Sequence, residues 1–121
     1  MKHSFTFQKL ADYLREFRFP FGTERSLQDA IETALGKSPW EYVRESLLAT
    51  GSTIDFLVGD IGIECKVDGS PSAVLAQLQR YATFDQISGL ILITSRHTHR
   101  FKTAEIAGKP LHVIWIAGTS L

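Results

Sequence analysis

Residues 54–67, IDFLVGDIGIECKV, carry a clear signal for a β-hairpin. Gly59-Asp60 is a two-residue turn of the Gly-X kind, and β-branched and aromatic residues flank it on both sides. Residues whose numbers sum to 119 then pair across the hairpin, so Asp55 faces Glu64. Because side chains alternate along a strand, one face is entirely apolar. We expect that face to hold Ile54, Phe56, Val58, Ile61, Ile63, Cys65 and Val67.

The opposite face of this hairpin carries the charged residues. Carboxylates that face each other repel, by roughly 0.2–1 kcal/mol when exposed and by more when water is excluded. Lys66 supplies part of the compensating charge, and a hard cation such as Mg²⁺ or Mn²⁺ would supply more and leave Lys66 free for chemistry. The alternative is a solvated sheet face with an Asp/Glu/Lys salt network. The residues expected on this face are Thr53, Asp55, Leu57, Gly62, Glu64, Lys66 and Asp68.

Composition indicates one domain. With 121 residues, 44% of them hydrophobic and 21% charged, the chain suffices for one compact core, so we expect residues 1–121 to form a single domain with an N-terminal helical extension at about 1–22. No segment approaches the ~20 apolar residues of a spanning helix, and the N-terminus lacks the apolar run of a signal peptide. Cys65, the single cysteine, fits a packing role in a reducing compartment. These features favour a cytoplasmic protein.

Positive charge is concentrated in the C-terminal third. The formal net charge is zero, which argues against indiscriminate coating of nucleic acid. From residue 87 onward, however, the one acidic residue is Glu105, and three histidines accompany the basic residues. This region could meet a phosphate backbone while the upstream acids hold metal, or it could be a solvated loop. The basic residues are Arg96, Arg100, Lys102 and Lys109.

Periodicity and turn signals give the order of elements. We expect helices over residues 8–18, over 24–35 with Thr23 as N-cap and Gly36 at C′, and over 71–84 with Ser70 and Pro71 as cap and first turn. Strands are expected at 42–49, in the hairpin, and in the apolar runs 90–93 and 111–117, with a short helix near 103–107. The fold class is therefore α/β: helix, helix, three strands, helix, strand, short helix, strand, with about five strands in a mixed sheet.

Asp55, Glu64 and Lys66 in a strand-turn-strand, followed by a helix and a strand, resemble the core of the PD-(D/E)XK nuclease superfamily. The family pattern is D-x(n)-(D/E)-x-K, and Ile54 stands where the family name has proline. The resemblance covers roughly residues 23–117. It implies a restriction-endonuclease-like fold and a Mg²⁺-dependent nuclease acting on DNA, in which Asp55, Glu64 and the backbone carbonyl of Cys65 hold the metal, with Mn²⁺ as a plausible substitute.

In such nucleases an acidic residue on the helix before the sheet usually completes the metal site. The candidates are Glu24 and Glu32. At about 100° per residue, Glu24 lies within the apolar stripe of that helix, whereas Glu32 lies about 80° to one side. We expect Glu24 to be the ligand. The alternative is an exposed first-turn acid that the helix dipole favours.

Gln77 and Tyr81 lie four residues apart on one helix surface. The pair resembles the Q-x-x-x-Y motif of the RecB-like branch, which implies that the glutamine helps to order the site and that the tyrosine lies near the nucleic acid. Without the resemblance, Tyr81 would be a core aromatic. Arg80 is a candidate phosphate contact together with Arg96, Arg100 and Lys102, and a solvated arginine is its alternative.

The expected function is phosphodiester hydrolysis, with Lys66 orienting the attacking water and stabilising charge on phosphorus. Zinc-ligand spacings, a P-loop and a G-x-S-x-G elbow do not occur in the sequence. The rival hypothesis is a catalytically silent nuclease-fold module for DNA binding or protein assembly. Retention of Asp55, Glu64, Lys66 and Gln77 favours catalysis. A chain this small offers little surface for reading bases. We therefore expect cleavage directed by branched, flapped or end-containing DNA, as in repair or recombination. A resolvase-like homodimer is one assembly that would suit such DNA.

Overall fold

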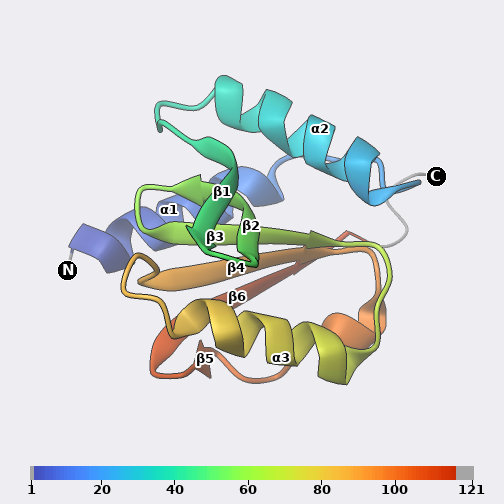
Figure 1. Cartoon of the computed structure of the whole chain (residues 1–121). Helices are drawn as coiled ribbons and strands as arrows, with labels where there is room; N and C mark the ends of the chain where they lie inside the picture. Colours follow the sequence, from blue (N-terminus) through green and yellow to red (C-terminus); the bar gives the residue numbers. More distant parts are fainter. Residues whose placement is uncertain (1, 117–121) are drawn as a thin grey trace.

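The computed structural model describes residues 2–116, and side chains from Thr6 onward. Within this range it is an α/β structure in which helices cover both faces of a mixed six-stranded sheet (Figure 1). The α/β class is therefore confirmed. The elements are α1 (Lys2–Arg15), α2 (Glu24–Gly36), β1 (Val43–Ala49), β2 (Ser52–Val58), β3 (Ile61–Lys66), α3 (Pro71–Ala82), β4 (Gly89–Thr94), the 3₁₀ turn η1 (His97–His99), β5 (Glu105–Ile106) and β6 (Lys109–Trp115).

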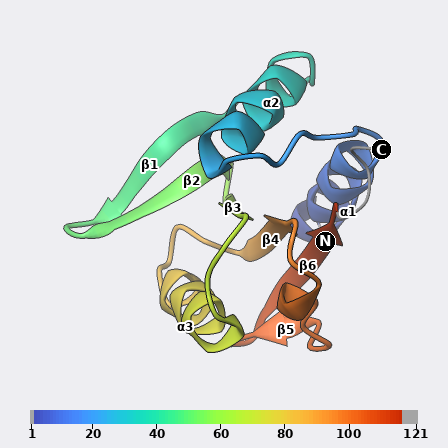
Figure 2. The same cartoon turned by 90° about the vertical axis from the view of Figure 1, so that its right-hand side faces the viewer.

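The strand order is β1-β2-β3-β4-β6-β5. The first three strands form an antiparallel meander, whereas β4 is parallel to β3 and β6 is parallel to β4. Parallel neighbours need a crossover connection, which α3 provides between β3 and β4. Helices α1 and α2 lie on one face of the sheet and α3 lies on the other (Figure 2). The carboxyl ends of β3, β4 and β6 therefore meet at one edge.

The expected hairpin register is confirmed near the turn. Phe56 pairs with Ile63, Val58 pairs with Ile61, and Gly59 has a φ of +62° that suits glycine at the turn. The prediction of the apolar face is wrong at one position. Ile54 packs into the cluster under α3 and not into the cluster that contains Phe56. Strand β2 therefore changes the face that it presents at Asp55, the residue between these two.

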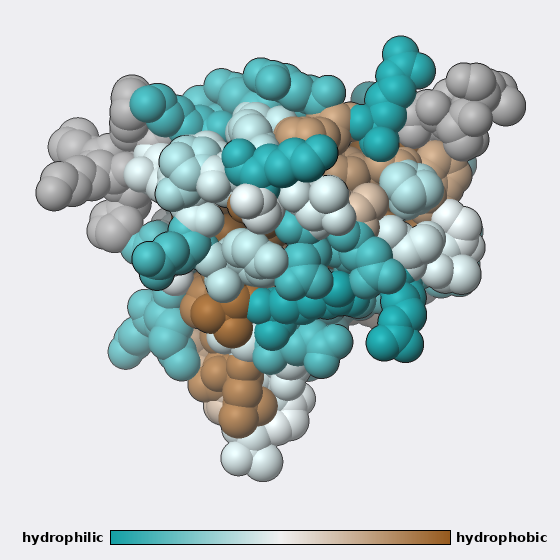
Figure 3. All heavy atoms as spheres, turned by 90° about the horizontal axis from the view of Figure 1, so that it is seen from above, coloured by the Kyte–Doolittle hydropathy of each residue, from teal (hydrophilic) through white to brown (hydrophobic). Residues whose placement is uncertain are grey.

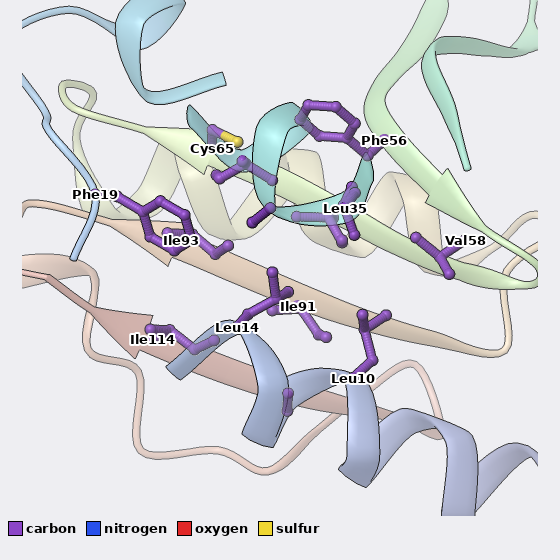
Figure 4. Packing of buried hydrophobic residues seen from close by; sticks show 14 of the residues in the cluster. Leu10, Leu14, Phe19, Leu35, Phe56, Val58, Cys65, Ile91, Ile93 and Ile114 are labelled. Atoms are coloured by element: carbon purple, nitrogen blue, oxygen red, sulfur yellow. The ribbon is translucent and has the colours of Figure 1, made fainter. Parts of the chain in front are cut away.

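The larger core cluster lies between the sheet and helices α1 and α2 (Figure 4). Helix α2 presents a stripe of fully buried residues at spacings of three and four, as an amphipathic helix does. The thiol of Cys65 belongs to this cluster, which confirms its packing role. The labelled residues in Figure 4 are Leu10, Leu14, Phe19, Leu35, Phe56, Val58, Cys65, Ile91, Ile93 and Ile114.

Two expected helix starts are confirmed by their caps. The Thr23 hydroxyl accepts a hydrogen bond from the Ser26 amide, and the Ser70 hydroxyl accepts one from the Ala73 amide. The expected stop at Gly36 is wrong, because α2 includes Gly36 and its C-cap is Lys37 in a right-handed conformation. Helix α1 begins at Lys2 rather than at residue 8 and ends at Arg15.

The short helix expected at residues 103–107 is also wrong. Those residues contain β5, which turns into β6 through Ala107 and Gly108, both at positive φ. Such a pair is typical of a tight hairpin turn, and a two-residue strand leaves no periodicity to detect. The strand expected at 111–117 begins earlier, at Lys109, and residue 117 lies outside the described residues. Within residues 2–116, each helix is too short or too polar to cross a bilayer.

Candidate functional site

Asp55 and Glu64 are linked across β2 and β3 by their own side chains. The Cys65 amide donates a 2.8 Å hydrogen bond to Asp55 Oδ2, and the Asp55 amide donates a 3.3 Å bond to Glu64 Oε1. The regular pairing between these strands runs from the turn to Phe56 and Ile63 and is not continued at this level. Each carboxyl group thus satisfies a backbone amide of the opposite strand, which holds both groups at the junction of the strands.

Both carboxyl groups are held in an environment that disfavours their charge. Glu64 is only 3% exposed, and burial together with the neighbouring Asp55 charge raises the pKa of Glu64 to about 8. Burial also raises the pKa of Asp55, although the Cys65 amide and the Lys66 charge oppose the rise. A hydrogen bond between the two carboxyl groups lowers the pKa of Asp55 as well. Such a pair holds its full negative charge only beside a compensating cation.

Lys66 provides part of that positive charge. Its Nζ lies 3.2 Å from Glu64 Oε2, and its side chain is 17% exposed. Glu64 and Lys66 are two residues apart on β3, so they project from the same face of the sheet. The structure therefore brings together the acid, acid and lysine that the hairpin pattern predicts.

The two acidic candidates on α2 lie in different surroundings. Burial raises the pKa of Glu24, Lys66 lowers it, and Asp55 raises it, so these charges lie within electrostatic reach of Glu24. Glu32 instead accepts bonds from Arg44 at 2.8 Å and from the Tyr42 hydroxyl at 3.0 Å. The structure thus places Glu24 toward the carboxylate pair and gives Glu32 an ion pair of its own. That Glu24 is a metal ligand stays a prediction.

Gln28 is a site residue that the sequence reasoning missed. A hydrogen bond with its side chain lowers the pKa of Asp55, and its Oε1 accepts a 3.2 Å bond from Arg44 Nη2. Gln28 lies one turn after Glu24 on α2, and residues four apart share a helix face. That spacing is the signal that could have identified it.

Gln77 and Tyr81 form a hydrogen-bonded chain that ends on β2. Gln77 Nε2 donates to the Tyr81 hydroxyl at 2.9 Å, and that hydroxyl donates to the Thr53 carbonyl at 2.9 Å. Tyr81 is 1% exposed, and burial, then the charges of Glu64 and Asp55, raise the pKa of Tyr81 to about 12. Because Tyr81 is buried, its ring has no face accessible to a nucleic acid. Its hydroxyl instead supports the strand that carries Asp55. Its alternative as a core aromatic is the better description.

The basic candidates lie around this region with different partners. Arg96 forms a 3.1 Å ion pair with Asp68, and the guanidinium of Arg100 lies over the Trp115 ring. Lys102 is exposed. Arg80 is exposed on α3, 5.8 Å from the centroid of the Tyr81 ring. All four side chains are exposed, and their contact with phosphate stays a prediction.

A divalent metal would have few protein ligands at this site. Among residues 2–116, no group of three or more His, Cys, Asp or Glu side chains is arranged to hold a metal ion. The donor set is the carboxylate pair, with Glu24 nearby. Burial raises the pKa of the Cys65 thiol well above its ordinary value, so Cys65 could contribute only its carbonyl. Mg²⁺ commonly binds through one or two carboxylates and keeps several waters, so this small set fits it.

Protein-family models, curated proteins and solved structures all give no match to this chain. The residues and contacts of the chain itself therefore indicate its function.

Proposed function

We propose that this protein is a metal-dependent nuclease that hydrolyses phosphodiester bonds in DNA. The observation that carries the proposal is the pair of buried carboxyl groups of Asp55 and Glu64 beside Lys66. Two acids in mutual contact, one of them with its pKa raised to about 8, weaken the fold unless a cation joins them. If the site were only a structural ion pair, one of the two acids would suffice to neutralise the charge of Lys66.

The arrangement of elements supports the same proposal. Three antiparallel strands, a helix and a parallel strand follow one another in β1, β2, β3, α3 and β4, which is the order that the PD-(D/E)XK resemblance implies. Glu64 and Lys66 lie toward the carboxyl end of β3, and ligands of open α/β sheets commonly bind beyond the carboxyl ends of strands. On this basis we assign the chain a restriction-endonuclease-like fold.

The metal that suits the donor set is Mg²⁺, with Mn²⁺ as a substitute. Asp55, Glu64 and the Cys65 carbonyl would hold it, and Glu24 would take part directly or through water. When bound, the ion would polarise the scissile phosphate and lower the pKa of a coordinated water.

The protein groups have separate tasks in this scheme. The Lys66 ammonium, held 3.2 Å from Glu64, is a fixed cation that stabilises negative charge on the phosphoryl oxygens and orients the attacking water. The Cys65 amide and Gln28 keep the Asp55 carboxylate in place. The Gln77–Tyr81 chain holds the Thr53 carbonyl, two residues before Asp55, and so positions β2. These contacts restrict the geometry before substrate arrives.

The test is a cleavage assay on linear, nicked, single-stranded, flapped and four-way-junction DNA with Mg²⁺, Mn²⁺ or EDTA. We expect metal-dependent cutting, preferentially of branched or end-containing DNA, that Asp55→Asn and Lys66→Ala reduce by at least a hundredfold. The matched controls are Asp85→Asn and Lys37→Ala, both at exposed positions. Cutting that survives both site substitutions would show that the activity belongs to another site or to a contaminant.

The second candidate is a catalytically silent module for DNA binding or assembly. It is favoured because, among residues 2–116, no group of three or more His, Cys, Asp or Glu side chains is arranged to hold a metal ion. Wild-type protein that binds junction DNA but cuts no substrate with either metal would support this candidate.

A homodimer is the assembly that we propose in either case. β1 is an edge strand with exposed Val43 and Leu47, 55% and 67% accessible, and Figure 3 shows apolar surface toward the projecting β1–β2 hairpin. Light scattering tests the dimer.

A further inference from the structure

Lys66 shares a row of the sheet with an exposed tryptophan. Lys66 pairs with Thr94 of β4, and Thr94 pairs with Trp115 of β6. Leu92 and Val113, two residues earlier in their strands, pack toward α3, so Thr94 and Trp115 project from that same face. Trp115 therefore lies two strands from Lys66, roughly 10 Å away at the usual strand spacing. Neighbouring nucleotides of one strand could span this separation.

Trp115 borders an open hollow of about 500 Å³ at this edge of the sheet. Among the residues that the structure describes, aromatic, basic and small apolar side chains line the hollow, and none of these is acidic. Trp115 is 41% exposed, which is unusual for the largest aromatic side chain in a folded domain. The lining residues are His97, Arg100, Phe101, Lys102, Val113 and Trp115.

In the hollow, the guanidinium of Arg100 contacts an aromatic ring instead of a carboxylate. The Arg100 guanidinium carbon lies 4.4 Å from the centroid of Trp115, a cation–π contact. Within the described residues, neither Arg100 nor Lys102 takes part in an ion pair. Both cations therefore remain available to an anionic ligand.

The segment that carries these cations is anchored in the protein. His99 is fully buried, with Nδ1 2.7 Å from the Thr94 hydroxyl and Nε2 2.7 Å from the Gly69 carbonyl. The ring of Phe101 stacks on His99 at 6.4 Å and 17°. The rim of the hollow is thus built before a ligand arrives, which lowers the entropic cost of binding.

We propose that the hollow binds an unpaired nucleotide of a single-stranded segment, with its base against Trp115 and its phosphate on Arg100 and Lys102. A partly exposed aromatic side chain beside cations is the usual combination of single-strand binding sites, because every base has a stacking face and every nucleotide has a charge. A base inside a duplex is already stacked on its neighbours. This inference rests on the proposed function for its biological meaning, since it specifies flapped or single-stranded ends as the substrate class.

The test measures binding in EDTA, so that hydrolysis plays no part. The chain has two tryptophans, and Trp40→Phe leaves Trp115 as the sole one. We expect an oligo-dT to quench the fluorescence of this variant and a blunt duplex of equal charge to quench it less. In the wild-type background, Trp115→Ala and Arg100→Ala should each weaken oligo-dT binding about tenfold. Trp115→Phe should restore most of the affinity, and Lys37→Ala should bind as wild type does.

Each outcome bears on one proposal at a time. Binding that requires Trp115, without any cleavage, supports this inference and overturns the proposed nuclease. Cleavage that requires Asp55, with no quenching and no effect of Trp115→Ala on oligo-dT binding, overturns the inference and leaves the nuclease. Equal quenching by a glutamate-rich peptide would overturn the inference by showing a site for anions in general. Oligo-rU beside oligo-dT distinguishes RNA from DNA as the source of the nucleotide. Melting curves of every variant confirm that it is folded.

Discussion

The Cys65 amide donates its hydrogen bond to the side chain of Asp55, at 2.8 Å, rather than to the backbone of β2. At the same level of β2, the pairing with β1 passes over Glu45, which has a φ of +56°. Strand β2 is therefore irregular toward both neighbours at Asp55. The irregularity places the carboxylate between strands and sends Ile54 to the face covered by α3.

Gly62 accommodates this change of face. A Cβ atom at Gly62 would lie 2.4 Å from Cδ1 of Ile54, a distance that real side chains do not adopt. We expect Gly62→Ala to destabilise the protein by about 1–3 kcal/mol, because overpacking displaces Ile54 or β3. Gly36→Ala is the matched control, since Gly36 lies in α2 with open space around it and should gain about 0.5–1 kcal/mol. Urea unfolding measures both. Recovery in the double variant Gly62→Ala, Ile54→Val would confirm the cause, and a neutral Gly62→Ala would contradict it.

Metal-free protein should lose stability as the pH rises. The pKa of Glu64 is about 8 in the folded protein, against an ordinary value of 4.5. Between these values the folded state binds more protons than the unfolded state, so the free energy of unfolding falls with rising pH, by an amount on the order of a few kcal/mol for a buried carboxyl group. Thermal unfolding from pH 5 to pH 8 in EDTA measures it. Glu64→Gln should flatten the dependence, and Asp85→Asn should leave it as in wild type. A Tm of wild type that is level across this range would refute the prediction.

Divalent metal should stabilise the folded protein most strongly at the alkaline end of that pH range. Binding to the ionised pair competes with protons, so Mg²⁺ or Mn²⁺ should raise Tm more at pH 8 than at pH 5.5. Asp55→Asn should abolish most of the rise. An equal rise in wild type and Asp55→Asn would place the metal elsewhere.

Tyr81→Phe should cost stability and also activity. The variant keeps the ring but removes the bond to the Thr53 carbonyl, a loss of about 1–2 kcal/mol. Tyr13→Phe is a close control, because the Tyr13 hydroxyl donates a similar 2.7 Å bond to the Ala34 carbonyl on the other side of the sheet. We expect comparable losses of stability by urea unfolding, and a fall in kcat only for Tyr81→Phe. Equal kcat values for the two variants would remove the positioning role.

Thr94→Val should loosen the segment that follows β4. The Thr94 hydroxyl accepts a 3.0 Å bond from the Arg96 amide and contacts Nδ1 of His99. An isosteric valine leaves both groups without this partner, at a cost of about 1–3 kcal/mol. Thr98→Val, at an exposed position of the same turn, should be nearly neutral. Hydrogen exchange at the Arg96 amide would detect the change, and unaltered exchange in Thr94→Val would count against it.

Local signals sufficed for the elements that local chemistry decides. The Gly59-Asp60 turn, the Thr23 and Ser70 caps and the period-two pattern around the turn depend on residues close in sequence, and all are present in the structure. The same alternation placed Asp55, Glu64 and Lys66 near one another. The prediction failed for the segment at 103–107, where a two-residue strand forms only because β6 is there to pair with it.

The chain by itself therefore determined the hairpin, the helix starts and the proximity of two acids and a lysine, because turn geometry and side-chain alternation are properties of neighbouring residues. Only the tertiary structure decided that Tyr81 is enclosed, that Gln28 reaches Asp55 and that Trp115 stands in the same row as Lys66. Those relationships join segments brought together by helix packing and parallel strand pairing, and the contact energies that fix them are absent from any one stretch of sequence.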